Sequence, residues 1–281
     1  MNSPISSRKY YRRWIYPLIS VCVATSIWLT SIPATQAFSL PELIFHGIRV
    51  LQLSTLSDRQ EVAIGKQINE QMVGREFKLY RNSGLTKYIN DIGQRLANTS
   101  DRPDIPYTFQ VVDNDQVNAF ATMGGFVYVN TGLILAADNE AQLASVMAHE
   151  VAHIAAQHAV KQMREMAVAQ GLASVAGVDQ NLAVRIGVEL ALRRPHSREA
   201  EYEADLLGMK NMAKAGYAPQ ATIDFLAKLM GKSSPPTFLS THPATRSRIS
   251  TLQELLDPRW ANRGAGMNNE AYRQLVQRLM S

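Results

Sequence analysis

The sequence predicts an α+β domain that is mostly helical and contains one small antiparallel sheet. Apolar residues recur at helical spacing along most of the chain after residue 57, whereas only three short segments, all between residues 107 and 129, alternate as strands do. The segment that follows these strands carries a His-Glu-x-x-His motif inside a long helical pattern. Because the strands directly precede this helix, we expect the sheet to pack beside it.

The positive charge of the chain is concentrated at its start. The 281 residues carry a formal net charge of +5, but four basic residues and no acidic ones lie in the first 37 positions. Once these four are removed, 25 basic residues remain against 24 acidic ones, so the rest of the chain is nearly neutral. No basic stripe is interleaved with aromatic residues, and the sequence therefore argues against nucleic-acid binding.

The first 37 residues resemble a secretory signal peptide. A basic stretch at 8–13 precedes an apolar stretch at 15–29, and cleavage is expected after Ala37. An uncleaved membrane anchor is the alternative. Export predicts a periplasmic or other extracytoplasmic location, with residues 38–281 as a single domain. Cys22 is the only cysteine, so the mature domain would hold neither a disulfide nor a thiolate metal site.

Two helices are expected before the sheet. Ser57 opens the first with a capping-box pattern, and this helix is expected to extend towards Tyr80. The second runs over residues 85–97 and has one apolar face. Both are interpreted as helices that cover the core.

The three predicted strands cover residues 107–112, 117–121 and 126–129, and a turn around 123–125 joins the last two. An exposed edge strand can pair with the main chain of an extended polypeptide. The alternative is that these strands only form the sheet on which the central helix packs, and both interpretations can hold together.

The central helix is expected over residues 139–163, with Asp138 or Asn139 as its cap. At roughly 100° per residue, His149 and His153 lie on one face, one turn apart, so that both imidazoles can bind one metal ion. Glu150 lies just around the helix, where its carboxylate can face a water on that metal. This arrangement is typical of a zinc peptidase. The alternative is a helix whose histidines only satisfy local hydrogen bonds.

A zinc ion held in this way needs a third protein ligand. His158 is five residues past His153, roughly 140° around a continuous helix, and is therefore interpreted as a core or second-layer histidine. A better candidate lies on the helix expected at 197–215, where Glu201 and Asp205 share one face. Beside that face run small residues that would let the two helices approach closely, namely Ala200, Ala204 and Gly208.

Among the acidic residues of this helix, position favours Glu201 as the metal ligand. Glu203 lines up with two lysines on a face that is interpreted as solvated, and Glu199 is interpreted as an ordinary acid at a helix start. Asp205 could accept the free ring N–H of a ligand histidine and hold its tautomer.

The remaining segments carry weaker signals. The apolar stretch at 164–192 lies over the cleft, contacts a membrane surface as a peripheral anchor, or only packs; these three interpretations stay open. Further helices are expected at 223–230, at 246–256 and near the C-terminus, with a proline-bearing loop at 231–241.

Taken together, the motifs resemble a known family. His-Glu-x-x-His is followed by Glu-x-Glu-Ala-Asp and then by His-Pro-x-x-x-x-Arg-Ile. This order is similar to the HtpX, BepA and CAAX-prenyl-protease family of zinc metallopeptidases, over roughly residues 57–256. The resemblance implies a zincin-like catalytic domain. Within the family the chain looks like the soluble, exported branch, because no transmembrane helix interrupts the catalytic segment.

The resemblance also implies roles for individual residues. One zinc ion per chain would be held by His149, His153 and Glu201, with Glu150 as the general base. His242 falls where some members have a histidine that can reach and block the metal.

Arg248 falls where the family has an arginine near the active site, a candidate for steadying the tetrahedral intermediate. The family's substrate-binding edge strand and turn correspond to Asn118, Ala119, Phe120, Gly124 and Gly125.

We therefore predict an exported zinc endopeptidase that acts on polypeptides, and the resemblance suggests misfolded or misassembled envelope proteins as its substrates. An adaptor or chaperone that binds unfolded chains and uses zinc for structure is the alternative from another class. A third possibility is an enzyme held inactive by His242 until the loop at 231–241 moves. The roughly 25 residues after Leu256 are too few for the helical repeats of some members, so docking through such repeats is not expected. The sequence sets no oligomeric state.

Overall fold

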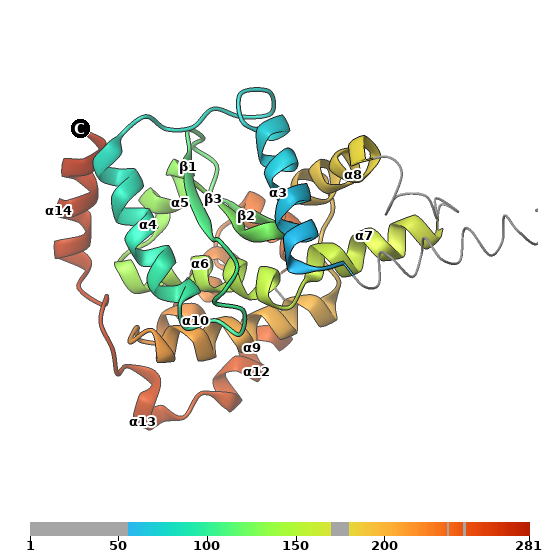
Figure 1. Cartoon of the computed structure of the whole chain (residues 1–281). Helices are drawn as coiled ribbons and strands as arrows, with labels where there is room; N and C mark the ends of the chain where they lie inside the picture. The colour runs from blue at the N-terminus through green and yellow to red at the C-terminus, as the bar shows by residue number, and fades with distance from the viewer. Residues whose placement is uncertain (1–55, 170–179, 235, 244–245) are drawn as a thin grey trace, which may run out of the picture. The chain divides into compact units, whose positions relative to one another are not determined.

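The computed structural model describes residues 56–169, 180–234, 236–243 and 246–281. These residues belong to one compact unit, His46–Ser281, and the predicted signal peptide lies outside the described part of the chain. The predicted fold class is confirmed: most described elements are helices, and they are arranged around one three-stranded sheet (Figure 1). No helix in the described ranges is long and apolar enough to cross a membrane.

The sheet has the strand order β1-β3-β2, with β1 at Thr108–Val112, β2 at Ala119–Thr122 and β3 at Phe126–Asn130. β2 and β3 are antiparallel and are joined by a short 3-10 turn, η1, at Met123–Gly125. β1 runs parallel to β3, so the sheet is mixed rather than antiparallel throughout. The sheet is mixed because β3 lies between β1 and β2, although it follows both of them in the sequence.

Two helices precede the sheet, as predicted: α3 (Asp58–Met72) and α4 (Ser83–Ala97). The predicted capping box at Ser57 is present at the start of α3. This helix ends earlier than expected, because Gly74 turns the chain with a φ of 86° and Leu79 then pairs with the outer side of β1.

The central helix, α6 (Glu140–Ala155), is buried over almost its whole length. The prediction that it continues to Met163 is wrong: the chain breaks at Gln157, whose φ is 57°, and continues as α7 (His158–Ala169). A left-handed conformation is unfavourable for a residue with a Cβ, and here it is accompanied by a side-chain hydrogen bond from Gln157 to Glu61 of α3. A tertiary contact of this kind leaves no mark on local periodicity.

The helix expected at 197–215 is present as α9 (Arg198–Lys214), and it packs along α6. A Cβ built on Gly208 would lie 3.1 Å from the backbone nitrogen of His149, so the predicted close approach is real. Part of the apolar stretch forms α8 (Gln180–Arg193), which packs against α3 and β2, while residues 170–179 lie outside the described part. The other helices are α5 (Thr131–Ala136), α10 (Gln220–Met230), α11 (Thr237–Thr241), α12 (Arg246–Leu255), α13 (Pro258–Ala261) and α14 (Asn269–Met280).

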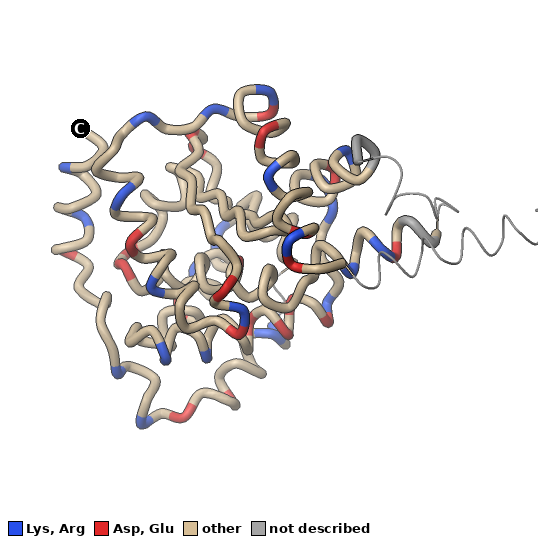
Figure 2. Tube along the Cα trace, viewed as in Figure 1, with Lys and Arg blue, Asp and Glu red and all other residues tan. Residues whose placement is uncertain are grey.

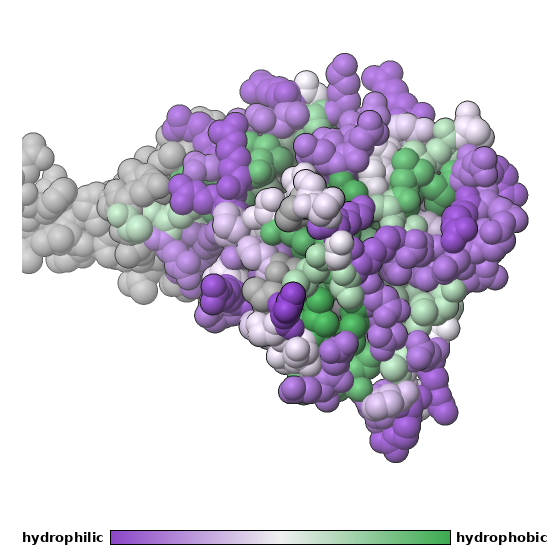
Figure 3. Space-filling view, turned by 180° about the vertical axis from the view of Figure 1, so that it is seen from behind, coloured by the Kyte–Doolittle hydropathy of each residue, from purple (hydrophilic) through white to green (hydrophobic). Residues whose placement is uncertain are grey.

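Two apolar cores hold these elements together. The larger joins the sheet and α4 to α6, α9, α10, α12 and α14, and the smaller joins α3, α7 and α8 to the sheet face that carries Phe120 and Tyr128. The strands carry no charged residue, and charges of both signs lie along the surrounding helices and loops (Figure 2). On the rear face, apolar side chains form separate patches among polar ones (Figure 3). The buried polar groups of α6 and α9 therefore stand out against an apolar interior.

Candidate metal centre

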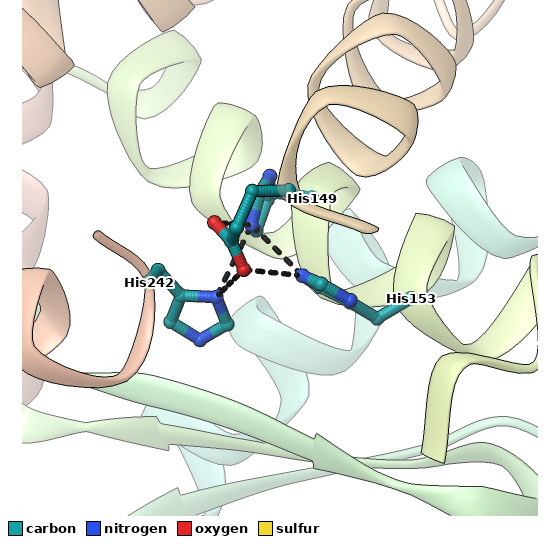
Figure 4. A group of neighbouring side chains, drawn as sticks. His149, His153 and His242 are labelled. Carbon is teal, nitrogen blue, oxygen red and sulfur yellow. Dashed lines mark hydrogen bonds and ion pairs between the residues drawn. The ribbon is translucent and has the colours of Figure 1, made fainter. Parts of the chain in front are cut away.

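Four buried side chains from three elements meet between α6 and α9. His149 and His153 come from α6, Glu201 from the first turn of α9, and His242 from the residue that ends α11. Each offers one ligand atom, and these atoms all lie within 4.8 Å of one another (Figure 4). Residue spacing predicted the first three as a set, whereas His242 was expected here only from the resemblance.

The distances within this cluster suit a small metal ion. The Nε2 atoms of His149 and His153 are 3.0 Å apart, and the carboxylate of Glu201 lies 3.5 Å and 3.4 Å from them. His242 Nδ1 is 3.0 Å from Glu201 Oε1 and 3.3 Å from His149 Nε2. Ligands bound at about 2.0–2.1 Å to a tetrahedral zinc ion are about 3.3 Å from one another. Imidazole nitrogens and a carboxylate are donors that zinc accepts, so the residues present fit this metal.

Glu150 faces the same space and is 1 % exposed. Burial raises the pKa of its carboxyl, although the nearby His242 and His149 and the backbone N–H of Ala121 oppose this effect. Its Oε1 atom accepts no hydrogen bond, and His242 Nε2 lies 3.4 Å from it. Buried carboxylate oxygens normally have a donor, so this atom is available to a ligand.

Asp205 lies behind His149, one turn beyond Glu201 on α9. Its Oδ1 atom is 3.1 Å from His149 Nδ1. A hydrogen bond there places a proton on Nδ1 and leaves Nε2 to face the other donor atoms. Burial lowers the pKa of His149, but the hydrogen bonds to Asp205 and Glu201 outweigh it and raise the pKa to about 10. A metal ion that binds here has to compete with a proton.

Arg248 of α12 is buried behind both carboxylates. Its Nε and Nη2 atoms each donate to Asp205 at 2.7 Å, and Nη1 lies 2.8 Å from Glu201 Oε2. Nη1 also donates to the carbonyl oxygen of Pro243, the residue after His242, at 2.9 Å. Burial raises the pKa of Asp205, but the hydrogen bonds from His149 and Arg248 lower it overall. The guanidinium thus orients two carboxylates, and its expected role towards a reaction intermediate stays a prediction.

His158 lies behind a predicted metal ligand, as expected, but it is not on the same continuous helix as that ligand. Because the helix breaks at Gln157, His158 turns back and places its Nδ1 2.8 Å from His153 Nδ1. On its other side, Nε2 is 3.1 Å from Glu203 Oε2. The interpretation of Glu203 as a purely solvated residue is therefore wrong: it is 49 % exposed, yet it contacts the histidine that supports His153.

His196 was missed by the sequence reasoning. Its ring stacks on His153 with centroids 4.0 Å apart, and its backbone N–H donates to the carbonyl of Thr241 at 3.3 Å. Burial and the neighbouring His242 lower its pKa to about 3. The residue precedes the cap of α9 in a proline-bearing loop, where no periodicity applies. In the sequence, the only indication that His196 lies near the site was its place directly before the helix that carries Glu201.

β2 is an outer strand of the sheet, and its last residues adjoin this cluster. Ala121 and Thr122 line the same hollow as His196 and His242, and α8 lines it from the other side. The backbone N–H of Phe238 in α11 donates to Val117 just before the strand, at 3.0 Å. Substrate binding remains a prediction for Asn118, Ala119, Phe120, Gly124 and Gly125.

Comparison with known proteins connects this geometry to a family of enzymes. Residues 84–256 match peptidase family M48. The beta-barrel assembly-enhancing protease of Escherichia coli K12 is 34% identical over 214 residues, which are 70% of this chain and 44% of that protein. The putative beta-barrel assembly-enhancing protease of Vibrio cholerae is 30% identical over 258 residues, which are 84% of this chain and 51% of that protein.

A mitochondrial relative shows the same likeness at greater distance. The mitochondrial metalloendopeptidase OMA1 of Schizosaccharomyces pombe is 29% identical over 180 residues, or 61% of this chain and 53% of that protein. The chain thus spans only about half the length of the curated relatives it matches. The matched family segment covers α4 to α12 and so contains the whole cluster around His149.

Proposed function

We propose that this chain, which belongs to peptidase family M48, hydrolyses internal peptide bonds of polypeptides with the help of one zinc ion. The observation that carries the proposal is the buried donor set of three histidines and a glutamate, with an oxygen of Glu150 beside it that accepts no hydrogen bond. A purely structural metal site has no need of such a carboxylate. For this reason the adaptor alternative, in which zinc serves structure alone, is not favoured.

Each residue of the centre has a task in this proposal. His149, His153 and Glu201 would hold the metal, and Asp205 and Arg248 keep the first and third of these in position. A bound zinc ion supplies an activated water and polarises the scissile carbonyl. Glu150 accepts a proton at its carboxylate and later returns it to the leaving amine, a contribution of typically about 10²–10⁴-fold. Its raised pKa suits a group that must both take and give a proton near neutral pH.

We further propose that His242 controls access to the site. Its ring lies between Glu150 and Glu201, 3.4 Å from the former and 3.0 Å from the latter, where a water and a substrate carbonyl would have to enter. It would serve as a fourth ligand in this conformation and leave when the segment at 231–241, which contains α11, moves. The change His242→Ala then raises peptidase activity, and an unchanged or lower rate would argue for a catalytic role instead.

The biological setting is a proposal as well. Residues 1–37 would be removed on export, residues 38–281 would form one catalytic domain, and the substrates would be misfolded or misassembled envelope proteins held along β2. The basic and apolar order of the leader and the names of the bacterial relatives support this setting. A broad substrate range suits an edge strand, because main-chain pairing does not depend on side-chain identity.

Metal content of the purified chain tests the centre most directly. The wild type should bind one zinc ion per chain, Glu201→Gln should lose it, and Glu203→Gln should retain it. Zinc-loaded wild type should cleave casein, an unfolded general substrate, and Glu150→Gln should bind zinc without cleaving. Retention of zinc by Glu201→Gln would disprove this third ligand. A wild type that takes up no zinc even after reconstitution would disprove the peptidase proposal.

A further inference from the structure

Among the described residues, a charged side chain outside the metal centre is completely buried close to it. Glu61, in the first turns of α3, is 0 % exposed. Both of its carboxylate oxygens accept two hydrogen bonds: Oε1 from Gly124 N at 3.2 Å and Arg102 Nη1 at 3.4 Å, and Oε2 from Arg102 Nη2 at 2.8 Å and Gln157 Nε2 at 3.0 Å. Burying a charged group costs free energy, and the cost is offset only when the group is paired and hydrogen-bonded. The partners of Glu61 therefore indicate which segments its carboxylate joins.

Its partners come from the segments that frame the metal centre. Gly124 belongs to the turn η1, directly after the edge strand β2. Gln157 is the left-handed residue that separates α6 from α7. Arg102 also donates to the carbonyl of Ile154 at 3.1 Å, so it reaches the residue next to His153. One carboxylate therefore connects the end of the edge strand with the end of the metal helix.

The backbone of α3 meets the same turn without spare room. A Cβ built on Gly65 would lie 2.1 Å from the carbonyl oxygen of Met123, and one built on Gly124 would lie 2.8 Å from the carbonyl oxygen of Glu61. Gly124 also has a φ of 77°, which favours glycine. Helix and turn are thus in direct backbone contact, and the hydrogen bond from Gly124 to Glu61 adds a polar contact at the same junction.

We propose that Glu61 is a positioning residue that fixes the position of β2 relative to α6. An extended substrate paired with β2 would then reach the metal centre in the correct register. This inference rests on the proposed peptidase function. Ala121 and Thr122, which line the hollow beside His242, lie three and two positions before Gly124, respectively. A displacement of about 1 Å between substrate support and reacting groups can cost about 10²-fold in rate. None of the described hydrogen bonds or ion pairs of Glu61 and Arg102 is with a predicted ligand or with Glu150.

The test compares Glu61→Ala with Glu61→Gln and with Asp58→Ala as a matched control. Asp58 lies on the same helix and also binds Arg102, through Nη2 at 2.6 Å, but its side chain is 66 % exposed and none of its described contacts is with Gly124. Amide hydrogen exchange of residues 119–125, zinc content, and KM and kcat for casein are measured on the zinc-loaded full chain. Glu61→Ala should speed exchange in this segment by at least about tenfold over the core of α9, with zinc content unchanged.

Kinetics should show the same selectivity. In Glu61→Ala, kcat/KM for casein should fall by about 10- to 100-fold, with most of the change in kcat, because substrate held out of register with the metal centre is bound but reacts slowly. Glu61→Gln should recover part of both effects, since its amide oxygen can still accept from Gly124. Asp58→Ala should stay within about twofold of wild type.

Exchange that rises equally in β2 and in α9 would overturn the proposal and leave a merely stabilising salt bridge. Unchanged exchange in residues 119–125 would also overturn it. If Glu61→Ala does not fold, the same exchange and kinetic measurements are made on Glu61→Gln and Gln157→Ala. Glu61→Gln keeps the size of the side chain, and Gln157→Ala removes one hydrogen bond to Glu61. If zinc-loaded wild type fails to cleave casein, the proposed function is in doubt, while the exchange data still decide whether Glu61 positions β2.

Discussion

Glu61 and Glu150 are both buried glutamates, and they differ in how their oxygens are satisfied. Glu61 accepts four hydrogen bonds and forms a salt bridge with Arg102 at 2.8 Å. Glu150 has an oxygen that accepts none, and burial raises its pKa. A satisfied buried charge supports the architecture, whereas an unsatisfied one costs stability and is kept for chemistry.

The largest effect is expected when the unsatisfied carboxylate is replaced. Glu150→Gln should reduce cleavage of casein by about 10²–10⁴-fold and leave zinc binding intact, because the amide keeps the shape but cannot take up a proton. Turnover assays on zinc-loaded protein measure this loss. Activity within tenfold of wild type would mean that another group is the base.

The same substitution should not destabilise the metal-free fold. Since the folded pKa of Glu150 lies above its ordinary value, folding takes up a proton, and this residue lowers the free energy of unfolding as pH rises above about 4.5. Glu150→Gln removes that penalty, so its stability relative to wild type should increase as pH rises above about 4.5. Urea unfolding in the presence of a chelator measures it, and a relative stability that falls with pH would contradict the comparison.

Glu61 should behave in the opposite way. Glu61→Ala leaves Arg102 largely buried with one exposed partner, and we expect the free energy of unfolding to fall by about 3 kcal/mol. Asp58→Ala, the exposed partner of the same arginine, should cost about 0–1 kcal/mol. Chemical denaturation of the two variants separates them, and equal losses would show that burial does not distinguish the two acids.

A third test concerns the residue behind the predicted ligands. Asp205→Asn keeps a hydrogen-bonding side chain but weakens the orientation of His149 and leaves Arg248 with a neutral partner. We expect zinc affinity to fall by about 10–100-fold, as measured by competition with a chelator. Affinity equal to wild type would mean that the contact with His149 is incidental.

The smallest effect is expected at Glu203. Its pKa is lowered by the hydrogen bond to His158 and by Lys161, yet half of the side chain is exposed, so solvent screens the interaction. Glu203→Gln should change the free energy of unfolding by less than about 1 kcal/mol and zinc affinity by less than about fivefold. A loss as large as that of Asp205→Asn would place Glu203 among the essential supports of the site.

The sequence by itself determined much of the centre. His149, Glu150 and His153 follow from the spacing of one helix, and Glu201 and Asp205 from one turn of another, because side-chain positions along a helix depend only on local geometry. The close approach of the two helices followed from the small residues that end at Gly208, and the helix start at Ser57 followed from capping chemistry.

Tertiary structure decided the remainder. The break at Gln157, the return of His158 to His153 and the stacking of His196 all depend on contacts between distant segments, which periodicity does not contain. The parallel pairing of β1 with β3 arises because β3 lies between β1 and β2 in the sheet. Glu61 appeared only as part of a capped, core-covering helix. Its hydrogen bond with Gly124, 63 positions further on, forms only when α3 packs onto the turn η1. The buried carboxylate of Glu61 then accepts hydrogen bonds from the donors that surround it there.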